Sequence, residues 1–277
     1  MTMLSINTNV GALQAASASY SVNKSMETSM QRLSSGKRIN TSADDAAGHQ
    51  IANRMTAEIQ GIKMAIRNAA DAQALLSTAE GAIEEIQTML LRLRELAVQS
   101  SNGTLDTVDK AAIQSEAAAL ELEITRVADN TTWAGLNILE GSQSAGITFQ
   151  IGADSGQTIT HSIYDFEAAS TTVGLTAAMT LGSFASAQTY ITGLDKAISG
   201  VATERAEIGA VMNRLDHTIA NLDNVATNLA LAKGRIEDAD FAAETSNLAR
   251  TQVLQQASMA MLAQANASKQ NILSLFQ

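Results

Sequence analysis

The sequence offers few residues that could do chemistry, beginning with three histidines, His49, His161 and His217. A metal centre or a general base needs a histidine close to other ligands or to acidic groups. These histidines lie far apart along the chain, no HExxH motif occurs, and there is no cysteine to supply a thiolate or a disulfide. The sequence therefore predicts no enzyme, no metal site and no cofactor. We expect His161 to end a strand and the other two to face solvent or packed helices.

Two pairs of adjacent acidic residues, Asp44-Asp45 and Glu84-Glu85, are the next candidates for acid–base chemistry. Two carboxylates share a proton only when they face each other, whereas adjacent residues of a helix point to different faces. Neither pair therefore predicts a catalytic dyad. We expect Asp44 and Asp45 instead to lie at the N-terminus of a helix, where their negative charge stabilises the helix dipole.

The elements that hold these residues must be mainly helical, because the 277-residue chain has no proline and only 3% aromatic residues. Without proline a helix can run uninterrupted, and few aromatics disfavour a large globular core. The net charge of −10 at pH 7 argues against non-specific nucleic-acid binding, which needs a basic surface. The longest charge-free stretch, 168–194, is interrupted by glycines, so we predict no membrane span. Residues 1–23 lack a basic region, so we predict no cleaved signal peptide.

Apolar residues seven positions apart predict three long helices that pack side by side. The first, from about 42 to 100, opens with a cap-like Ser42-x-x-Asp45. Its stripe is Met55, Ile62, Ala69, Leu76, Ile83, Leu90 and Ala97. A shorter helix follows with Ile113, Ala117, Leu120, Ile124 and Val127. The third, at about 187–234, carries Leu194, Val201, Ile208, Leu215, Leu222 and Leu229, with companions Ile191, Ile198, Met212, Ile219 and Ala226. In this third pattern only Arg205 does not fit.

Between the second and third helices the period changes to two. Residues 147–151 and 159–163 alternate apolar and polar side chains around a glycine-containing turn, which predicts a β-hairpin.

The two ends of the chain form amphipathic arms with few charges. Each has a face of small residues that suits close packing against another helix. Isolated helices of this kind are marginal in water, so we expect the arms to order when they meet partners. The candidate self-assembly residues are Ile6, Val10, Leu13, Leu33, Leu254, Met261, Ala265, Ile272 and Leu275.

Several ordered blocks make the sequence resemble bacterial flagellin over residues 1–140 and 190–277. They include Leu33-Ser-Ser-Gly-Lys-Arg-Ile-Asn40, Asp44-Asp-Ala-Ala-Gly48, Arg94-Glu-Leu-Ala-Val-Gln-Ser100, Arg235-Ile-Glu-Asp-Ala-Asp240 and Ala260-Met-Leu-Ala-Gln-Ala-Asn266. The chain lacks room for the large outer domains that many family members carry, so it resembles a minimal form. It departs from the family at Trp133-Ala-Gly135, where Phe-Asn-Gly is common, at His49, where an aliphatic residue is more usual, and at Ser268-Lys-Gln-Asn271, where a proline is usual nearby.

The resemblance implies a mainly α fold, in which long antiparallel rods form a coiled-coil bundle with a small β-hairpin region and the N- and C-terminal arms pair as a coiled coil. It implies an inner domain from arms 1–41 and 235–277, and a rod domain from 42–186 and the helix 187–234. The implied function is a structural subunit that polymerises into the extracellular flagellar filament used for swimming.

The same resemblance implies specific partners. These are other copies of the chain, hook-associated junction and cap proteins, an export chaperone and the flagellar type III export apparatus, with no nucleic acid and no membrane. It also implies that Arg92, Arg94, Glu95 and Glu116 form a surface buried between subunits and recognised by a host innate immune receptor of the Toll-like class. The Ser/Thr-rich region 142–192 is a candidate for O-glycans.

Two other functions stay open at the level of sequence. A hook–filament junction protein would share the terminal arms but should match less well in the last blocks. A coiled-coil adaptor would form oligomers of fixed size rather than open-ended filaments.

Overall fold

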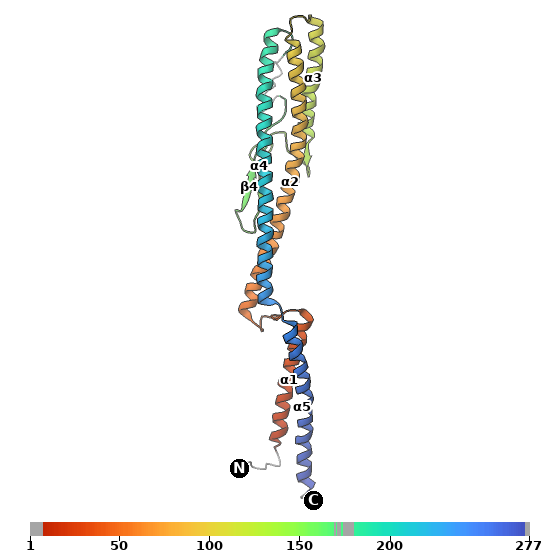
Figure 1. The fold of residues 1–277 in the computed structure, drawn as a ribbon, viewed down its shortest axis with the longest axis vertical. Coiled ribbons are helices and arrows are strands. Elements are labelled where there is room, and N and C mark those ends of the chain that lie inside the picture. Colours follow the sequence, from red (N-terminus) through yellow and green to blue (C-terminus); the bar gives the residue numbers. More distant parts are fainter. Residues whose placement is uncertain (1–7, 169, 171–172, 174–179, 275–277) are drawn as a thin grey trace. The chain divides into compact units, whose positions relative to one another are not determined.

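A computed structural model describes residues 8–168, 170, 173 and 180–274, and the described chain is mainly helical (Figure 1). The chain folds into two compact units, one made of residues 1–59 with 227–277 and the other of residues 60–226. The predicted mainly α fold, with long rods, a small β region and paired arms, is confirmed. The finer division at residues 41, 186 and 234 stays a prediction.

In the first unit, α1 (Val10–Ser35) and α5 (Phe241–Ser274) lie side by side (Figure 1). The Asn9 side chain accepts a hydrogen bond from the Ala12 N–H and so caps α1, which ends at Gly36 with φ 70°. At the start of α5, Asp240 Oδ1 accepts hydrogen bonds from the backbone N–H groups of Ala242 and Ala243. Each helix of the arm pair therefore has its own start signal.

The helix α2 (Ala46–Ser100) begins four residues later than predicted, and its cap differs from the predicted one. Asp45 Oδ1 accepts a hydrogen bond of 2.9 Å from the Gly48 N–H, so Asp45 caps the helix and Ser42 does not. Asp44 Oδ2 instead accepts from the N–H groups of Asn40 and Thr41, and these backbone bonds lower the pKa of the Asp44 carboxyl. The expected role of acidic charge at this helix start is therefore confirmed for Asp45.

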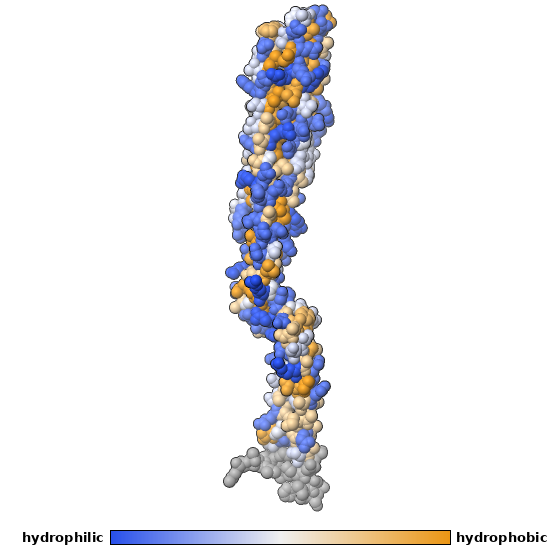
Figure 2. All heavy atoms as spheres, in the orientation of Figure 1, coloured by the Kyte–Doolittle hydropathy of each residue, from blue (hydrophilic) through white to orange (hydrophobic). Residues whose placement is uncertain are grey.

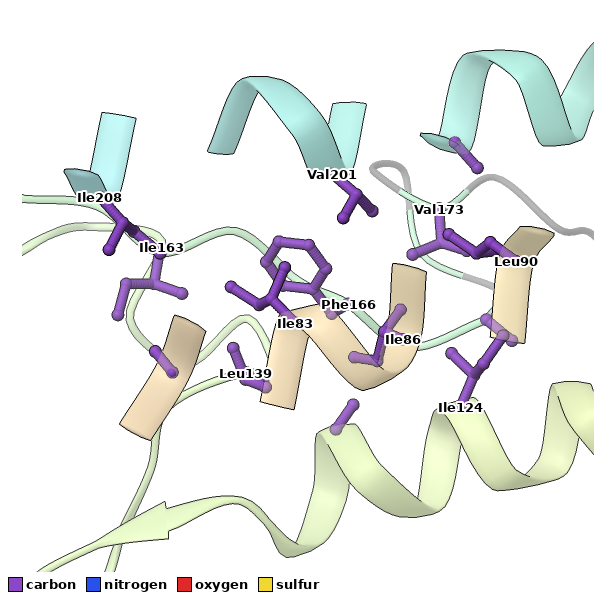
Figure 3. Packing of buried hydrophobic residues seen from close by; sticks show 14 of the residues in the cluster. Ile83, Ile86, Leu90, Ile124, Leu139, Ile163, Phe166, Val173, Val201 and Ile208 are labelled. Carbon is purple, nitrogen blue, oxygen red and sulfur yellow. The ribbon is translucent and has the colours of Figure 1, made fainter. Parts of the chain in front are cut away.

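In the second unit, α2, α3 (Thr107–Asn130) and α4 (Phe184–Glu237) enclose the core that Figure 3 shows. The predicted stripe of α2 is confirmed, because Ala69, Leu76, Ile83, Leu90 and Ala97 are all 0% exposed. A second apolar row on α2 runs beside this stripe, four residues after it at Ile59 and Ile66 and three residues after it from Ala72 on. Ile59 and Ile66 are half-buried, whereas Ala72, Ala79, Ile86 and Leu93 are buried.

The connection between α3 and α4 contributes to this core. Leu139, Ile163 and Phe166 are fully buried, and in Figure 3 they lie beside Ile83 of α2. Tyr190 of α4 is also buried, and its hydroxyl donates to the carboxylate of Glu121 on α3. Burial raises the pKa of Glu121.

The packing face of α4 is rotated by one residue from the predicted companion positions. Leu194, Val201, Ile208 and Leu215 are buried as predicted. The buried companions, however, are Tyr190, Ala197, Glu204 and Val211. Of the predicted companions Ala226 is buried, whereas Ile191, Ile198, Met212 and Ile219 are half-buried. The charged residue inside the core is therefore Glu204, whereas Arg205, which interrupts the predicted companion row, is half-buried like most of that row.

Two short antiparallel hairpins complete the second unit. The first pairs β1 (Thr132–Trp133) with β2 (Leu136–Asn137) and was not predicted. The second pairs β3 (Ile147–Gln150) with β4 (Thr158–His161), with Ile147 opposite His161, and confirms the predicted hairpin. Within the described residues, none of the helices combines the length and the apolar character that a bilayer crossing requires.

Candidate assembly surfaces

The contact between α1 and α5 is built mainly from small and polar residues. The less exposed residues of each helix alternate three and four apart, as in a two-stranded coiled coil. On α1 they are Ala12, Ala15, Ser19, Val22, Met26, Ser29 and Leu33. On α5 they are Glu244, Leu248, Thr251, Gln255, Ser258, Leu262 and Ala265. The small-residue faces predicted for the arms therefore pack against each other.

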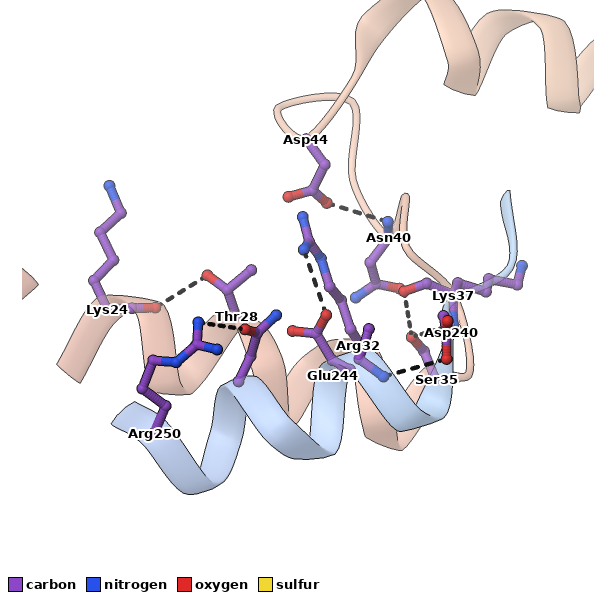
Figure 4. Close-up of polar contacts among 12 residues, drawn as sticks. Lys24, Thr28, Arg32, Ser35, Lys37, Asn40, Asp44, Asp240, Glu244 and Arg250 are labelled. Carbon is purple, nitrogen blue, oxygen red and sulfur yellow. Dashed lines mark hydrogen bonds and ion pairs between the residues drawn. The ribbon is translucent and has the colours of Figure 1, made fainter. Parts of the chain in front are cut away.

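Polar contacts fix the antiparallel register of this pair. The Asn9 side chain donates to the Ala265 carbonyl at 3.1 Å, and the Gln255 side chain donates to Asn23 Oδ1 at 2.8 Å. Near the other end, Arg32 lies 3.8 Å from the Glu244 carboxylate, as Figure 4 shows. These three contacts show that α1 and α5 run antiparallel.

Large apolar side chains of both arms point away from this contact. Tyr20 is 74% exposed and Met261 is 64% exposed, and Val10, Leu13 and Leu254 are also exposed. We call these five residues the outer arm face. Figure 2 shows apolar residues at the surface of the α1–α5 region. Beside Met261, a groove of about 490 Å³ runs between the two helices over Gly11, Ala15, Ala18 and Ala265.

The predicted arm residues therefore divide into two groups. Val10, Leu13, Leu254 and Met261 belong to the outer arm face, whereas Leu33 and Ala265 are half-buried between the helices. Ile6 and Leu275 lie outside the described residues, and Ile272 lies within α5 but its side chain is not described.

A cluster of charged residues just after the C-terminal end of α1 was not identified from the sequence. Lys37 lies 2.6 Å from the Glu237 carboxylate, and Lys233 lies 3.5 Å from it. Burial tends to raise the pKa of Glu237, but the two lysines outweigh it and the pKa is lowered. Arg38 adds backbone links, since its N–H donates to the Glu237 carbonyl and its guanidinium to the Ile236 carbonyl. Lys233 and Glu237 are an i,i+4 pair on α4 that the sequence could have shown, whereas Lys37 and Arg38 meet Glu237 only through the fold.

On the second unit, three of the four predicted charged residues come together. The Arg92 guanidinium lies 2.8 Å from Glu116 of α3 and 2.9 Å from Glu95. Hydrogen bonds to Glu116 and Glu95 raise the pKa of Arg92. Arg94 does not join them, because it pairs with Asp195 of α4 at 2.7 Å. Asp195 was missed, since a single acidic residue on an exposed helix face carries no signal of its own.

The histidines occupy three different environments. His161 is buried at the end of β4, where Nε2 lies 3.4 Å from Glu204 Oε1, and its predicted place in a strand is confirmed. His49 is half-buried on α2, and His217 is exposed on α4. In the part of the chain that the structure describes, no three acidic or histidine side chains gather in a way that could hold a metal ion.

Comparison with known proteins gives a consistent result. Residues 6–144 match the model of the bacterial flagellin N-terminal helical region, and residues 191–276 match that of the C-terminal helical region. The chain is 40% identical over 273 residues to a flagellin of Halalkalibacterium halodurans, covering 98% of this chain and 99% of that protein.

Solved structures are similar as well. The crystal structure of Bacillus cereus flagellin aligns with a TM-score of 0.50 and 37% identity, over 60% of this chain and 94% of that one. A putative flagellar hook-associated protein from Vibrio parahaemolyticus aligns with a TM-score of 0.59 over 70% of this chain and all of that one. Its identity is only 15%, so that likeness concerns the fold alone.

Proposed function

The chain belongs to the bacterial flagellin family and is a structural subunit of the flagellar filament, not an enzyme, and we propose that its copies polymerise through the outer arm face. The observation that carries this proposal is the division of side chains in the arm pair. Small residues lie between α1 and α5, and Val10, Leu13, Tyr20, Leu254 and Met261 lie outside.

The energetics favour further contacts on that outer face. A helix pair whose contact is made largely by small and polar residues buries less apolar surface within itself than one joined throughout by large apolar side chains. Burying one large apolar side chain stabilises by about 1.5–3 kcal/mol relative to leaving it in water. Each outer residue covered by a neighbouring copy therefore favours assembly, and the arms order where that burial occurs.

Seeded polymerisation of purified full-length chain tests the proposal. Leu13→Gln and Met261→Gln each remove an apolar contact from the outer arm face while keeping a residue that helices accept. We expect each variant to raise the lowest concentration that supports filament growth by about tenfold or more, since 1.4 kcal/mol corresponds to tenfold. Helicity of the monomers, measured by far-UV circular dichroism, should equal that of the unmodified chain.

Leu122→Gln is the matched control, because Leu122 is equally exposed but lies on α3, outside the arms. The proposal expects this variant to assemble within about twofold of the unmodified chain, well below the tenfold step of 1.4 kcal/mol. Unchanged assembly by Leu13→Gln and Met261→Gln would contradict the role of the outer arm face. Discrete oligomers in place of filaments would favour the coiled-coil adaptor or the hook–filament junction alternative.

We also propose that the Arg92–Glu95–Glu116 cluster, with Arg94 nearby, contributes to packing between subunits and is available to a host innate immune receptor before assembly. Its support is the resemblance together with the exposure of these side chains, which are about half accessible to solvent. The ion pairs hold Arg92 and Glu116 in one arrangement across two helices, so a partner meets a defined pattern of charge.

The remaining partners are proposed on the family alone. They are hook-associated junction and cap proteins at the filament ends, an export chaperone, and the flagellar type III export apparatus that delivers the subunit outside the cell without a cleaved signal peptide. In the same way we propose that the arms 1–41 and 235–277 form the inner domain, and that 42–186 and 187–234 form the rod domain around it.

A further inference from the structure

Glu204 is the most unusual residue of the second unit, because it occupies a core position of α4 between Val201 and Ile208. It is 1% exposed, and no protein group among the described residues donates a hydrogen bond to either of its carboxylate oxygens. An ionised carboxylate in such a place is costly unless an opposite charge lies close by.

Among the described residues, His161 is the one basic side chain within 4.0 Å of the Glu204 carboxylate. His161 is 6% exposed, and its Nε2 lies 3.4 Å from Glu204 Oε1. The two residues come from different elements, since His161 ends β4 and Glu204 lies on α4. The pair therefore joins the β3–β4 hairpin to the helix behind it.

The other charged groups in this part of the unit are paired elsewhere or exposed. Arg205, the next residue of α4, lies 3.6 Å from Glu80 and 4.0 Å from Glu84 of α2, and it donates to Gln87. On the hairpin, β3 and β4 carry no charged group besides His161. Beyond β4, Asp165 accepts a hydrogen bond from the Glu167 N–H, and on α4 Glu207 is exposed.

Elsewhere the hairpin contacts α2 through two neutral contacts, and the exposed Asp71 of α2 lines a groove with Thr148, Phe149 and Gln150 of β3. The Asn68 side chain donates to the Gln150 carbonyl at 3.1 Å, and Gly61 lies against Ala153 at the hairpin turn. Neither contact changes with pH. Among the described residues, the His161–Glu204 pair is thus the buried part of the hairpin attachment that can gain or lose a proton.

We propose that this buried pair is a pH-sensitive contact, which keeps the β3–β4 hairpin packed on α4 only while the pair carries no net charge. An imidazolium beside a carboxylate and a neutral imidazole beside a carboxylic acid both meet that condition. Adding one more proton leaves a buried positive charge, and removing one leaves a buried negative charge. The hairpin is therefore released at both acid and alkaline pH.

Single amide substitutions separate release of the hairpin at acid pH from its release at alkaline pH. With Glu204→Gln, deprotonation can leave no negative charge, so alkaline release disappears while acid release remains because His161 can still become an imidazolium. With His161→Gln, protonation can leave no positive charge, so acid release disappears while alkaline release remains. The double variant should release the hairpin at neither acid nor alkaline pH.

Fluorescence of Trp133 reports release of the hairpin. It is the only tryptophan in the chain, and it lines a groove with Thr148, Phe149 and Gln150 of β3. We expect Trp133 emission of the unmodified monomer to shift to the red at both ends of the pH range over which far-UV circular dichroism stays constant. Each single variant should keep one shift, and the double variant should keep none.

Glu207→Gln and His217→Gln are matched controls, since both residues are exposed on the same helix, and Asp71→Asn removes the titratable group that lines the groove of Trp133. Each of these three variants should keep both shifts. Amide hydrogen exchange on the unmodified chain gives a second measurement that needs no variant. Exchange in residues 147–161, relative to residues 107–130 in the same sample, should be slowest at intermediate pH. The proposal is overturned if the ratio of exchange in residues 147–161 to that in residues 107–130, and the Trp133 emission, do not vary with pH, or if the Glu204→Gln variant keeps its alkaline shift.

Discussion

The side-chain amide of Asn9 donates a hydrogen bond to the backbone carbonyl of Ala265, 3.1 Å away and 256 residues later in the sequence. The oxygen of the same side chain accepts from the Ala12 N–H and caps α1. One asparagine thus starts the N-terminal arm and joins it to the C-terminal arm.

Substitutions at Asn9 should separate these two roles. Asn9→Ala removes both, and the loss of a cap alone costs about 1 kcal/mol. We expect the concentration threshold for seeded filament growth to rise by roughly tenfold. Asn9→Asp keeps the capping oxygen but cannot donate to the Ala265 carbonyl. Its threshold concentration should therefore lie between that of the unmodified chain and that of Asn9→Ala. Equal thresholds for all three chains would show that this contact does not matter for assembly.

Gly61 predicts a second effect, at the hairpin. A Cβ added at Gly61 would lie 2.9 Å from the Ala153 Cβ, whereas one added at Gly81, also on α2, meets nothing within 4 Å. Glycine to alanine within a helix usually stabilises by about 0.5–1 kcal/mol. We therefore expect Gly81→Ala to raise the free energy of unfolding by that amount, and Gly61→Ala to lower it.

Denaturant unfolding measures both changes, and a compensating variant checks their cause. Gly61→Ala combined with Ala153→Gly removes the close approach, so it should recover most of the lost stability. No recovery would mean that the hairpin turn does not pack on α2 at Gly61.

The left-handed backbone at Ala134 indicates a stabilising substitution. It has φ 50° and precedes Gly135 with φ 83°, as in the two-residue turns that favour Asn-Gly. A left-handed conformation costs an alanine about 1–2 kcal/mol, and less for asparagine. Ala134→Asn should therefore raise the free energy of unfolding by about 0.5–1 kcal/mol, measured by thermal denaturation. Ala119→Asn, on the exposed face of α3, should instead lower it slightly.

Glu95→Lys tests the charged cluster on α2. The change breaks the pair with Arg92 and places a third positive charge beside Arg92 and Arg94. Exposed ion pairs contribute at most about 1 kcal/mol, so the monomer should stay folded. Filament growth and receptor signalling should weaken together. Glu85→Lys is the control, because Glu85 is exposed on the same helix and forms no ion pair among the described residues. Full-length filaments with unchanged signalling would refute the role of this cluster.

The long helices could be predicted from the sequence because their packing faces repeat through many turns. A stripe such as Leu76, Ile83 and Leu90 identifies its buried face whatever the partner is. The rotation of α4 could not be predicted in the same way. Glu204 and Arg205 are adjacent and both charged, so the sequence pattern does not indicate which of them is buried, and in the fold it is Glu204 that lies in the core beside His161.

The arms show the same limit. Hydropathy identifies Leu13 and Met261 as apolar, but whether they face the other arm or the outside depends on how α1 meets α5. Small residues such as Ala12 and Ser19 carry a weak hydropathy signal, although they form the contact. Pairs that join distant segments, such as Arg94 with Asp195, likewise appear only once the fold brings them together.

Chemical labelling of single cysteines tests the central claim most directly, because the chain has no cysteine of its own. Tyr20→Cys and Met261→Cys place a thiol on the outer arm face, and Ser144→Cys places one on an exposed loop as a control. We predict that all three react quickly with a maleimide in the monomer, and that in filaments the first two become protected while Ser144→Cys still reacts. Cysteines at 20 and 261 that react as fast in filaments as in monomers would contradict polymerisation through the outer arm face.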